Sequence, residues 1–172
     1  LYARYGLSED AAHFMAVLAM DLNAILLSDV NSSFKLVRNV KRAVETALEG
    51  LVPVLAVYRV ISREDPLPHS WDVTSDSISC YVCHLVGCKT LILLKDVDGV
   101  YEEDPKLNPN ARLLRRVRAS ELKGRKTCLD PYLPGLLIRY GVECWVLNGL
   151  KPGLVYESLL DGLKHGTRVL PA

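Results

Sequence analysis

Residues Leu85–Tyr101 read LVGCKTLILLKDVDGVY, and this stretch decides the fold class. The residues Thr90–Leu94 are apolar after the first one and show no alternation, which is typical of a parallel strand covered on both faces. Gly87 lies before this strand, where a helix predicted over Ser75–Val86 would end in a left-handed cap. After Lys95 the chain turns polar at once. A helix, a buried strand and a polar loop therefore follow one another.

The order of helix, glycine and buried strand occurs twice more, and this repetition predicts an α/β fold with a mainly parallel sheet. One copy comprises Val40–Glu49, Gly50 and a strand over Leu51–Tyr58; the other comprises Leu133–Tyr140, Gly141 and a strand over Glu143–Leu147. Further helices are expected at Glu9–Leu27 and Leu154–Leu163; a short segment near Phe34–Val37 leads to the helix at Val40, and Thr167–Leu170 close the domain. A length of 172 residues suits one core, so we expect residues 1–172 to form a single domain.

Composition excludes several classes of function. The chain has 21 basic and 20 acidic residues, so no overall field marks it as a binder of nucleic acid or of an acidic membrane. No apolar run reaches the roughly 20 residues of a membrane helix. Five cysteines, an odd number, favour reduced thiols and a cytoplasmic location. Because the chain begins at Leu1 without an initiator region, we expect an N-terminal part of the protein to be missing.

Three polar segments follow the predicted strands. They are Pro68–Ser77, Lys95–Pro105 and Asn148–Gly153. In open α/β sheets, ligands bind outside the carboxyl ends of the strands. Each segment is far more polar than the strand before it, so this edge of the sheet is the predicted binding site.

The start of the helix predicted at Ser75 is a candidate anion site. Thr74 and Ser75 supply hydroxyl groups beside free backbone N–H groups, which suits a phosphate or a carboxylate, although one of them can equally serve only as the N-cap. Asp72 and Asp76 would repel an anion there unless they hold cations in place. We therefore interpret these two aspartates as organisers of lysines or of a metal ion.

Taken together, these segments resemble the second half of the amino acid kinase superfamily. The residues that carry the resemblance are Thr74–Ser77, Leu91–Tyr101, Asp104–Lys106 and the ending Gly166–Leu170. The resemblance implies a three-layer αβα sandwich with a mainly parallel sheet. It also implies an ATP-dependent phosphotransferase that uses Mg²⁺ and a small-molecule acceptor. The glycine-rich motifs and one lysine of the family precede the residues present here.

The resemblance also implies roles for individual residues. Asp76 matches the aspartate that orients the catalytic lysines, and the acceptor positions match Asp72 and Thr74, with Ser75 beside them. The residues expected to bind ATP are Lys95, Asp96, Gly99, Tyr101, Asp104 and Pro105. The family's second lysine is replaced by Asp130, which we expect to contact the substrate. Lys126 is the nearest substitute for that lysine and is added to the ATP site.

Within the superfamily, the string His69–Ser77 and the later Val146–Gly149 are most similar to archaeal kinases of methanofuran biosynthesis. This resemblance implies aminomethyl-furanyl-methyl phosphate as the acceptor. A non-catalytic nucleotide-binding storage or regulatory protein of the same fold is the alternative, because a lysine is replaced. The helix Glu9–Leu27 is apolar nearly all round, which predicts burial in the core or in the interface of a homodimer or larger homo-oligomer.

Three other signals have two interpretations each. Cys80 and Cys83 form a CxxC pair, but no second pair follows at zinc spacing, so we interpret them as small buried hydrophobic residues and expect no protein-bound metal site. The basic segment Arg112–Lys126 lacks aromatic residues that would stack on bases, which favours a solvated face over RNA binding. His69 and Trp71 either pack the loop or contact the substrate.

Overall fold

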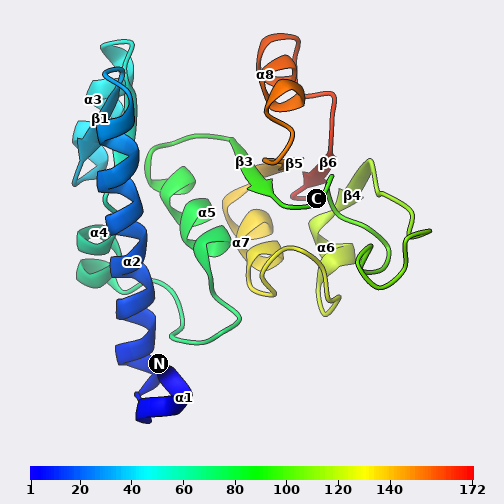
Figure 1. The fold of residues 1–172 in the computed structure, drawn as a ribbon, viewed down its shortest axis with the longest axis horizontal. Helices are drawn as coiled ribbons and strands as arrows, with labels where there is room; N and C mark the ends of the chain where they lie inside the picture. Colours follow the sequence, from blue (N-terminus) through cyan, green and yellow to red (C-terminus); the bar gives the residue numbers. More distant parts are fainter. The chain divides into compact units, whose positions relative to one another are not determined.

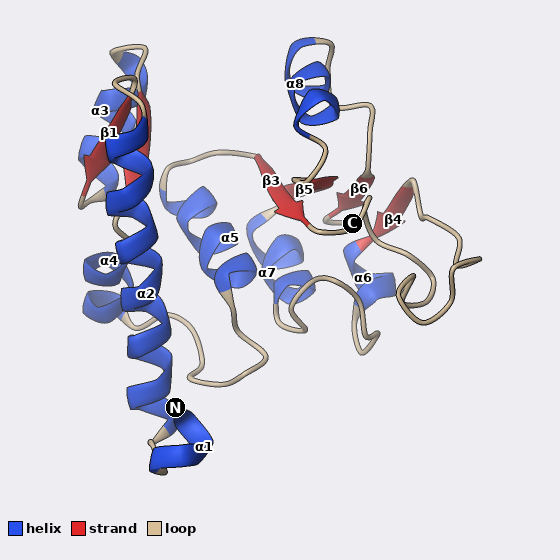
Figure 2. Cartoon of the chain, in the orientation of Figure 1, coloured by secondary structure: helices blue, strands red, loops and turns tan.

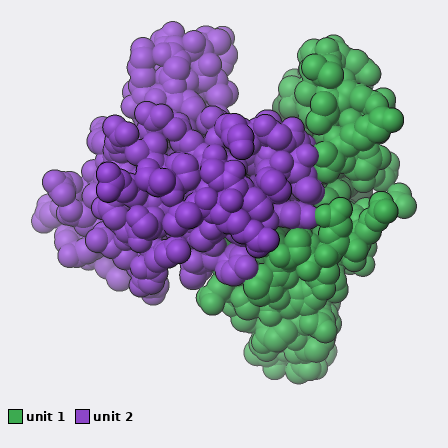
Figure 3. Space-filling view, turned by 180° about the vertical axis from the view of Figure 1, so that it is seen from behind, with its two compact units in different colours: residues 1–78 green, residues 79–172 purple.

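The computed structural model describes residues 1–172, which divide into two compact units, Leu1–Ile78 and Ser79–Ala172. Figure 3 colours the two units separately. We call them unit 1 and unit 2 and describe each by itself. The expectation of a single domain stays a prediction.

Unit 1 is built around one long helix, α2 (Glu9–Val30), preceded by the short helix α1 (Tyr2–Tyr5) (Figure 1). Ser8 begins α2 as its N-cap, since its side-chain oxygen accepts a hydrogen bond of 3.2 Å from the Ala11 N–H. The strands β1 (Phe34–Val37) and β2 (Val52–Leu55) form a two-stranded parallel sheet, with α3 (Val40–Leu48) as their crossover. Helix α4 (Tyr58–Glu64) follows β2 and packs against α2.

Unit 2 holds a four-stranded sheet in the order β3-β5-β6-β4. Its strands are β3 (Thr90–Lys95), β4 (Arg116–Arg118), β5 (Glu143–Asn148) and β6 (Thr167–Leu170). The pairs β3–β5 and β4–β6 are parallel, and β5–β6 is antiparallel.

Helices flank the unit 2 sheet on both sides. Figure 2 shows α6 (Ala119–Leu122) and α7 (Leu133–Tyr140) on one face and α8 (Pro152–Leu160) on the other. Helix α5 (Ser75–Leu85) begins in unit 1 and ends in unit 2. There its His84 ring stacks on Tyr140 of α7 with ring centres 4.0 Å apart. These layers follow from strands whose two faces both carry apolar side chains.

The predicted fold class is confirmed, including mainly parallel pairing and helices on both faces of a sheet. Gly50, Gly87 and Gly141 have φ values of 77°, 77° and 61°, as expected of left-handed residues after helices. The strand predicted over Leu51–Tyr58 is shorter, because α4 already begins at Tyr58. That strand also pairs only with β1 and lies outside the four-stranded sheet.

Helix α2 is mostly exposed within this chain, which contradicts burial in the core on most sides and does not test burial in an interface between copies. Of its 22 residues, only His13, Val17 and Ala24 are buried, so it is not covered on most sides. By length and composition it could also cross a membrane, with a mean hydropathy of 1.6 over its most apolar window, of which 17% is buried. The expectation that no segment meets this criterion was wrong. A single such helix is weak evidence for a membrane span, since core helices of soluble proteins meet it too.

Candidate functional site

The polar loops after β3 and β5 meet at one edge of the unit 2 sheet, because these two strands are parallel neighbours. The side-chain amide of Asn148, the last residue of β5, donates a hydrogen bond of 2.8 Å to Asp98 in the loop after β3. Lys151 Nζ lies 2.6 Å from the same carboxylate oxygen. The hydrogen bond from Lys151 lowers the pKa of Asp98 below its ordinary value, and Asn148 adds to this effect. Asp98 therefore fixes the two loops to each other.

A cavity of about 270 Å³ opens beside the loop after β3, and we call it the unit 2 cavity. All seven residues predicted to bind ATP line it: Lys95, Asp96, Gly99, Tyr101, Asp104, Pro105 and Lys126. Glu103, Lys106, Thr127 and Cys128 are further lining residues. The structure thus brings the seven predicted residues together around one cavity. Nucleotide binding by these residues stays a prediction.

Thr167 packs against Gly99, which lines the unit 2 cavity. Gly99 has φ of 150°, and a Cβ there would overlap the Thr167 hydroxyl oxygen, so a larger residue does not fit. That hydroxyl accepts a hydrogen bond of 2.8 Å from the Val100 N–H and donates one of 2.6 Å to the Leu114 carbonyl. Thr167 is fully buried. The last strand therefore holds the start of the loop in place.

Lysines and carboxylates balance along the unit 2 cavity. Lys106 Nζ lies 2.6 Å from Asp96 Oδ2, and this hydrogen bond lowers the pKa of Asp96 and raises that of Lys106. The side chains of both residues are more than half exposed, so the pair stabilises the loop little. Lys95 and Lys126 are the other two lysines that line this cavity.

The predicted acceptor residues in unit 1 lie at the start of α5. Thr74 and Ser75 are exposed, and Asp76 is buried with 3% of its surface accessible. The Thr74 hydroxyl lies 3.5 Å from the Asp76 N–H, which is a long and weak N-cap contact. Asp72 is exposed in the preceding turn. The helix start was therefore placed correctly from the sequence, while the roles of these residues stay predictions.

A second cavity, of about 240 Å³, lies wholly within unit 1, and we call it the unit 1 cavity. Helix α2 and the segment 70–78 line it. The lining residues from α2 are Glu9, Ala12, His13, Ala16, Val17 and Met20, and those from the segment are Ser70, Trp71, Val73, Thr74, Ser75 and Ile78. Of the residues predicted to contact the acceptor, Thr74 and Ser75 line this cavity, whereas Asp72 does not. Asp76 does not line it either.

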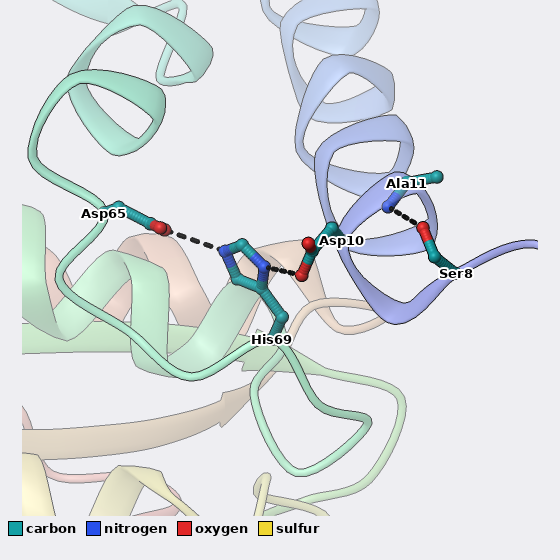
Figure 4. Close-up of polar contacts among 5 residues, drawn as sticks. All are labelled: Ser8, Asp10, Ala11, Asp65 and His69. Carbon is teal, nitrogen blue, oxygen red and sulfur yellow. Dashed lines mark hydrogen bonds and ion pairs between the residues drawn. The ribbon is translucent and has the colours of Figure 1, made fainter.

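His69 fixes the loop that leads to this cavity. Its ring nitrogens lie 2.7 Å from Asp10 Oδ1 at the start of α2 and 2.7 Å from Asp65 Oδ1 after α4, as Figure 4 shows. These hydrogen bonds, the one with Asp10 first, raise the pKa of His69. Asp65 has φ of 44°, a left-handed conformation that a non-glycine residue seldom adopts. The contacts support the interpretation that His69 packs the loop, while Trp71 is 66% exposed and lines the unit 1 cavity.

Asp130 lies in unit 2 but does not line either cavity. It is buried, and its Oδ1 accepts a hydrogen bond of 2.7 Å from the N–H of Leu133, the first residue of α7. The carboxylate thus caps the start of a helix. Its expected contact with the substrate stays a prediction.

The cysteines of the CxxC pair are buried. Cys80 is inaccessible, and burial raises its pKa to about 12; burial likewise raises the pKa of Cys83 to about 11. Thiols in this state are neutral and unreactive at physiological pH. They pack as small hydrophobic residues.

Two residues of the unit 1 cavity were missed by reasoning from the sequence. Glu9 and His13 are four residues apart on α2, and this spacing places them on one face of the helix. A histidine in a helix otherwise rich in Ala, Leu and Met was a signal that could have revealed them. In unit 2, Lys106 was part of a recognised segment but was not included in the predicted ATP site.

Comparisons with known proteins identify the family of the chain. A family model described as the amino acid kinase family matches residues 6–137. The chain is 29% identical over 161 residues to a (5-(aminomethyl)furan-3-yl)methyl phosphate kinase of Methanocaldococcus jannaschii, and the match covers 92% of this chain and 70% of that protein. It is 32% identical over 108 residues to a uridylate kinase of Pyrococcus abyssi, covering 57% of this chain and about half, 48%, of that relative.

Among solved structures, a UMP kinase from Bacillus anthracis superposes with a TM-score of 0.78 at 19% identity. The superposition covers 99% of this chain and 73% of that one. At this identity the likeness concerns the fold alone.

Proposed function

The chain belongs to the amino acid kinase family, and from this premise we propose that it transfers the γ-phosphoryl group of ATP to (5-(aminomethyl)furan-3-yl)methyl phosphate. Its curated relatives are small-molecule kinases, hence phosphotransferases. One observation carries the proposal of ATP as donor: the seven residues predicted to bind it line one cavity after β3. The relative that covers 92% of this chain supports the choice of acceptor.

The chain's own residues contribute position and charge. Phosphoryl transfer depends mainly on the placement of the reacting groups and on neutralisation of charge. In the proposed mechanism Lys95 and Lys126 attract the phosphates of ATP, and the Tyr101 ring packs on the nucleoside. Thr74 and Ser75 offer hydroxyl and N–H donors to the acceptor's phosphate. Asp76 does not transfer a proton but positions the cations that surround the migrating group.

Mg²⁺ enters this proposal with the substrate. No group of three His, Cys, Asp or Glu side chains in the chain could hold a metal ion. Mg²⁺ is commonly bound by substrate phosphates and one or two carboxylates, which fits the acidic residues Asp96 and Asp104 of the unit 2 cavity. When bound, the ion supplies charge neutralisation between the phosphates.

A non-catalytic nucleotide-binding protein of the same fold is the second candidate. Asp130 favours it, because a buried helix-capping carboxylate stands where the family has a lysine. The two candidates differ in turnover. We expect the full-length protein to release ADP with the aminomethyl-furan phosphate, and far less with UMP or glutamate. ATP binding without ADP release on any acceptor would favour the second candidate.

We further propose a cytoplasmic homodimer that uses the exposed side of α2. Four exposed residues of α2, spaced by three, four and three positions, are Met15, Leu18, Leu22 and Ile25, and this spacing is typical of a helix-helix seam. A second copy of α2 would cover them and remove a large exposed apolar patch.

Sedimentation of the full-length protein tests the proposed dimer. We expect a dimer at micromolar concentration and its dissociation by Leu22→Glu. Leu48→Glu is the control, because Leu48 is 83% exposed at the end of α3 and outside the seam. A wild-type monomer would contradict the proposal.

A further inference from the structure

The unit 1 cavity has an unusual polar member in His13. This side chain is 8% exposed, and its Nε2 atom is buried without a hydrogen-bond partner. Buried polar atoms are nearly always paired, because leaving one unpaired costs about 1–3 kcal/mol. His13 also lines the cavity. A buried side chain that lines a cavity and has an unpaired nitrogen points to a ligand that supplies the missing partner.

Resting on the proposed kinase function, we propose that the unit 1 cavity holds the organic part of the acceptor, a single aromatic ring that carries an ammonium group. Glu9, His13 and Trp71 are then the residues that select this acceptor. Of the three, only Trp71 was considered as a substrate contact from the sequence. The inference follows from the size of the cavity, its charge and its unpaired nitrogen.

The size of the cavity suits an acceptor with one ring. A dry apolar cavity of about 150 Å³ accommodates benzene. The unit 1 cavity measures about 240 Å³, so one substituted ring fits it better than a base joined to a sugar. Ala12, Ala16 and Val17 of α2 present small apolar side chains to such a ring.

The charge of the cavity favours a cation. No lysine or arginine lines it, whereas the Glu9 carboxylate does. Glu9 Oε1 accepts a hydrogen bond of 2.5 Å from the Tyr2 hydroxyl, and the Tyr2 ring packs edge-on against Trp71 with ring centres 5.3 Å apart. Tyr2 thus positions both a carboxylate and an exposed indole. Carboxylates and indole faces both attract ammonium groups.

His13 complements this arrangement as a neutral acceptor. Burial lowers its pKa, and the charge of His69, stacked on it with ring centres 4.2 Å apart, lowers the pKa further. With its proton on Nδ1, neutral imidazole accepts a hydrogen bond at Nε2. An ammonium group donates that bond, whereas a carboxylate cannot. The start of α5, at Thr74 and Ser75, also lines the cavity and suits the acceptor's phosphate.

Calorimetric binding to the full-length protein without ATP tests this inference. The probes are (5-(aminomethyl)furan-3-yl)methyl phosphate and the analogue in which a methyl group replaces the aminomethyl group. We expect the wild type to bind the amine at least about tenfold more tightly, as one charge-assisted hydrogen bond allows. Glu9→Gln, His13→Phe and Trp71→Leu should each reduce this preference. Lys41→Ala on α3, where the lysine is exposed, should keep it.

The outcomes separate this inference from the proposed function. Equal affinity of the wild type for both probes, or a preference that survives all three substitutions, would overturn the inference. If ADP is still released with the amine probe in that case, the kinase proposal stands. Conversely, selective binding of the amine without ADP release on any acceptor supports the cavity's specificity and contradicts the kinase. Glu9 is exposed, so Glu9→Gln should fold even if His13→Phe does not.

Discussion

The two cavities differ in what surrounds them. The unit 2 cavity is lined by lysines and carboxylates from a loop held by buried hydrogen bonds of Thr167. The unit 1 cavity is mainly apolar and contains one carboxylate and one unpaired imidazole nitrogen. A cavity lined by equal numbers of lysines and carboxylates suits ATP, a phosphoryl donor that many enzymes share. A small apolar cavity with few polar groups suits discrimination between acceptors.

The largest expected effect concerns Asp76, which belongs to neither lining. Asp76→Asn preserves shape and removes a buried charge at the start of α5. We expect turnover of the full-length enzyme to fall about 100-fold or more, because misplaced electrostatic groups cost that much. The affinities for ATP and acceptor should change less. Rapid-quench or steady-state kinetics with binding measurements would check this.

Ser79→Ala on the same helix is the control for Asp76→Asn. It removes a hydroxyl near the helix start without changing the charge. Near-normal turnover of Asp76→Asn would mean that Asp76 only begins the helix. The catalytic role proposed for Asp76 would then be wrong, while the binding roles proposed for the two cavities would be unaffected.

The rigidity of the unit 2 cavity is tested by Thr167→Val. Valine keeps the shape but leaves the buried Val100 N–H and Leu114 carbonyl without the hydroxyl, which should cost about 2 kcal/mol of unfolding free energy. Urea unfolding measures this loss. Thr90→Val is the control, since Thr90 is exposed at the start of β3. Equal stabilities of the two variants would contradict a structural role for the Thr167 hydroxyl.

The elements that could be predicted are those with a strong local pattern. Helix α7 and strand β6 have the predicted bounds, because glycine ends the former and β-branched residues form the latter. Strand β4 has only three residues, and its hydrogen bonds depend on β6, more than forty residues later. Its arginine-rich sequence has no strand pattern of its own. Pairing with a distant strand is information that local periodicity does not contain.

The residues of the two cavities also differ in how well the sequence predicts them. The ATP residues lie within one short loop and Lys126, so their motif predicted a set that proved to line one cavity. Glu9 and His13 come from a helix that meets the segment 70–78 only in the folded unit. On the sequence alone, His13 is one more residue in an apolar helix. Its significance comes from an unpaired buried nitrogen, which is seen only in the folded unit.

If ATP binds only in the unit 2 cavity, Tyr101→Ala should weaken the binding of ATP and not that of the acceptor. Loss of the ring should weaken ATP binding about tenfold, a typical effect of removing one packed aromatic ring. Acceptor binding should not change. Calorimetry with each ligand checks both expectations, and Tyr156→Ala on α8 is the control, because Tyr156 is 66% exposed. Equal weakening of both ligands would show that the two cavities do not have separate roles.

The smallest effect is expected from the His69 contacts, and it depends on pH. Asp10 and Asp65 raise the pKa of His69 above its ordinary value of 6.5, so this residue stabilises unit 1 fully below pH 6.5. That contribution is lost as the pH rises through the raised value. His13, whose pKa is lowered, acts in the opposite direction: its contribution is present above pH 6.5 and is lost on acidification. Since His13 stays buried when His69 is replaced, its effect largely cancels in the difference between wild type and His69→Asn.

We therefore expect His69→Asn to lower the unfolding free energy most near pH 6, by less than about 1 kcal/mol because both aspartates are largely exposed. The difference should shrink as the solution becomes alkaline. Urea unfolding at several pH values measures it, with His84→Asn as the control, since His84 stacks on Tyr140 and has no recorded carboxylate partner. A difference that stays constant from acid to alkaline pH would mean that His69 acts through packing alone. His69 would then hold the unit 1 cavity in shape without its charge, and the His69 charge would not be what keeps His13 neutral.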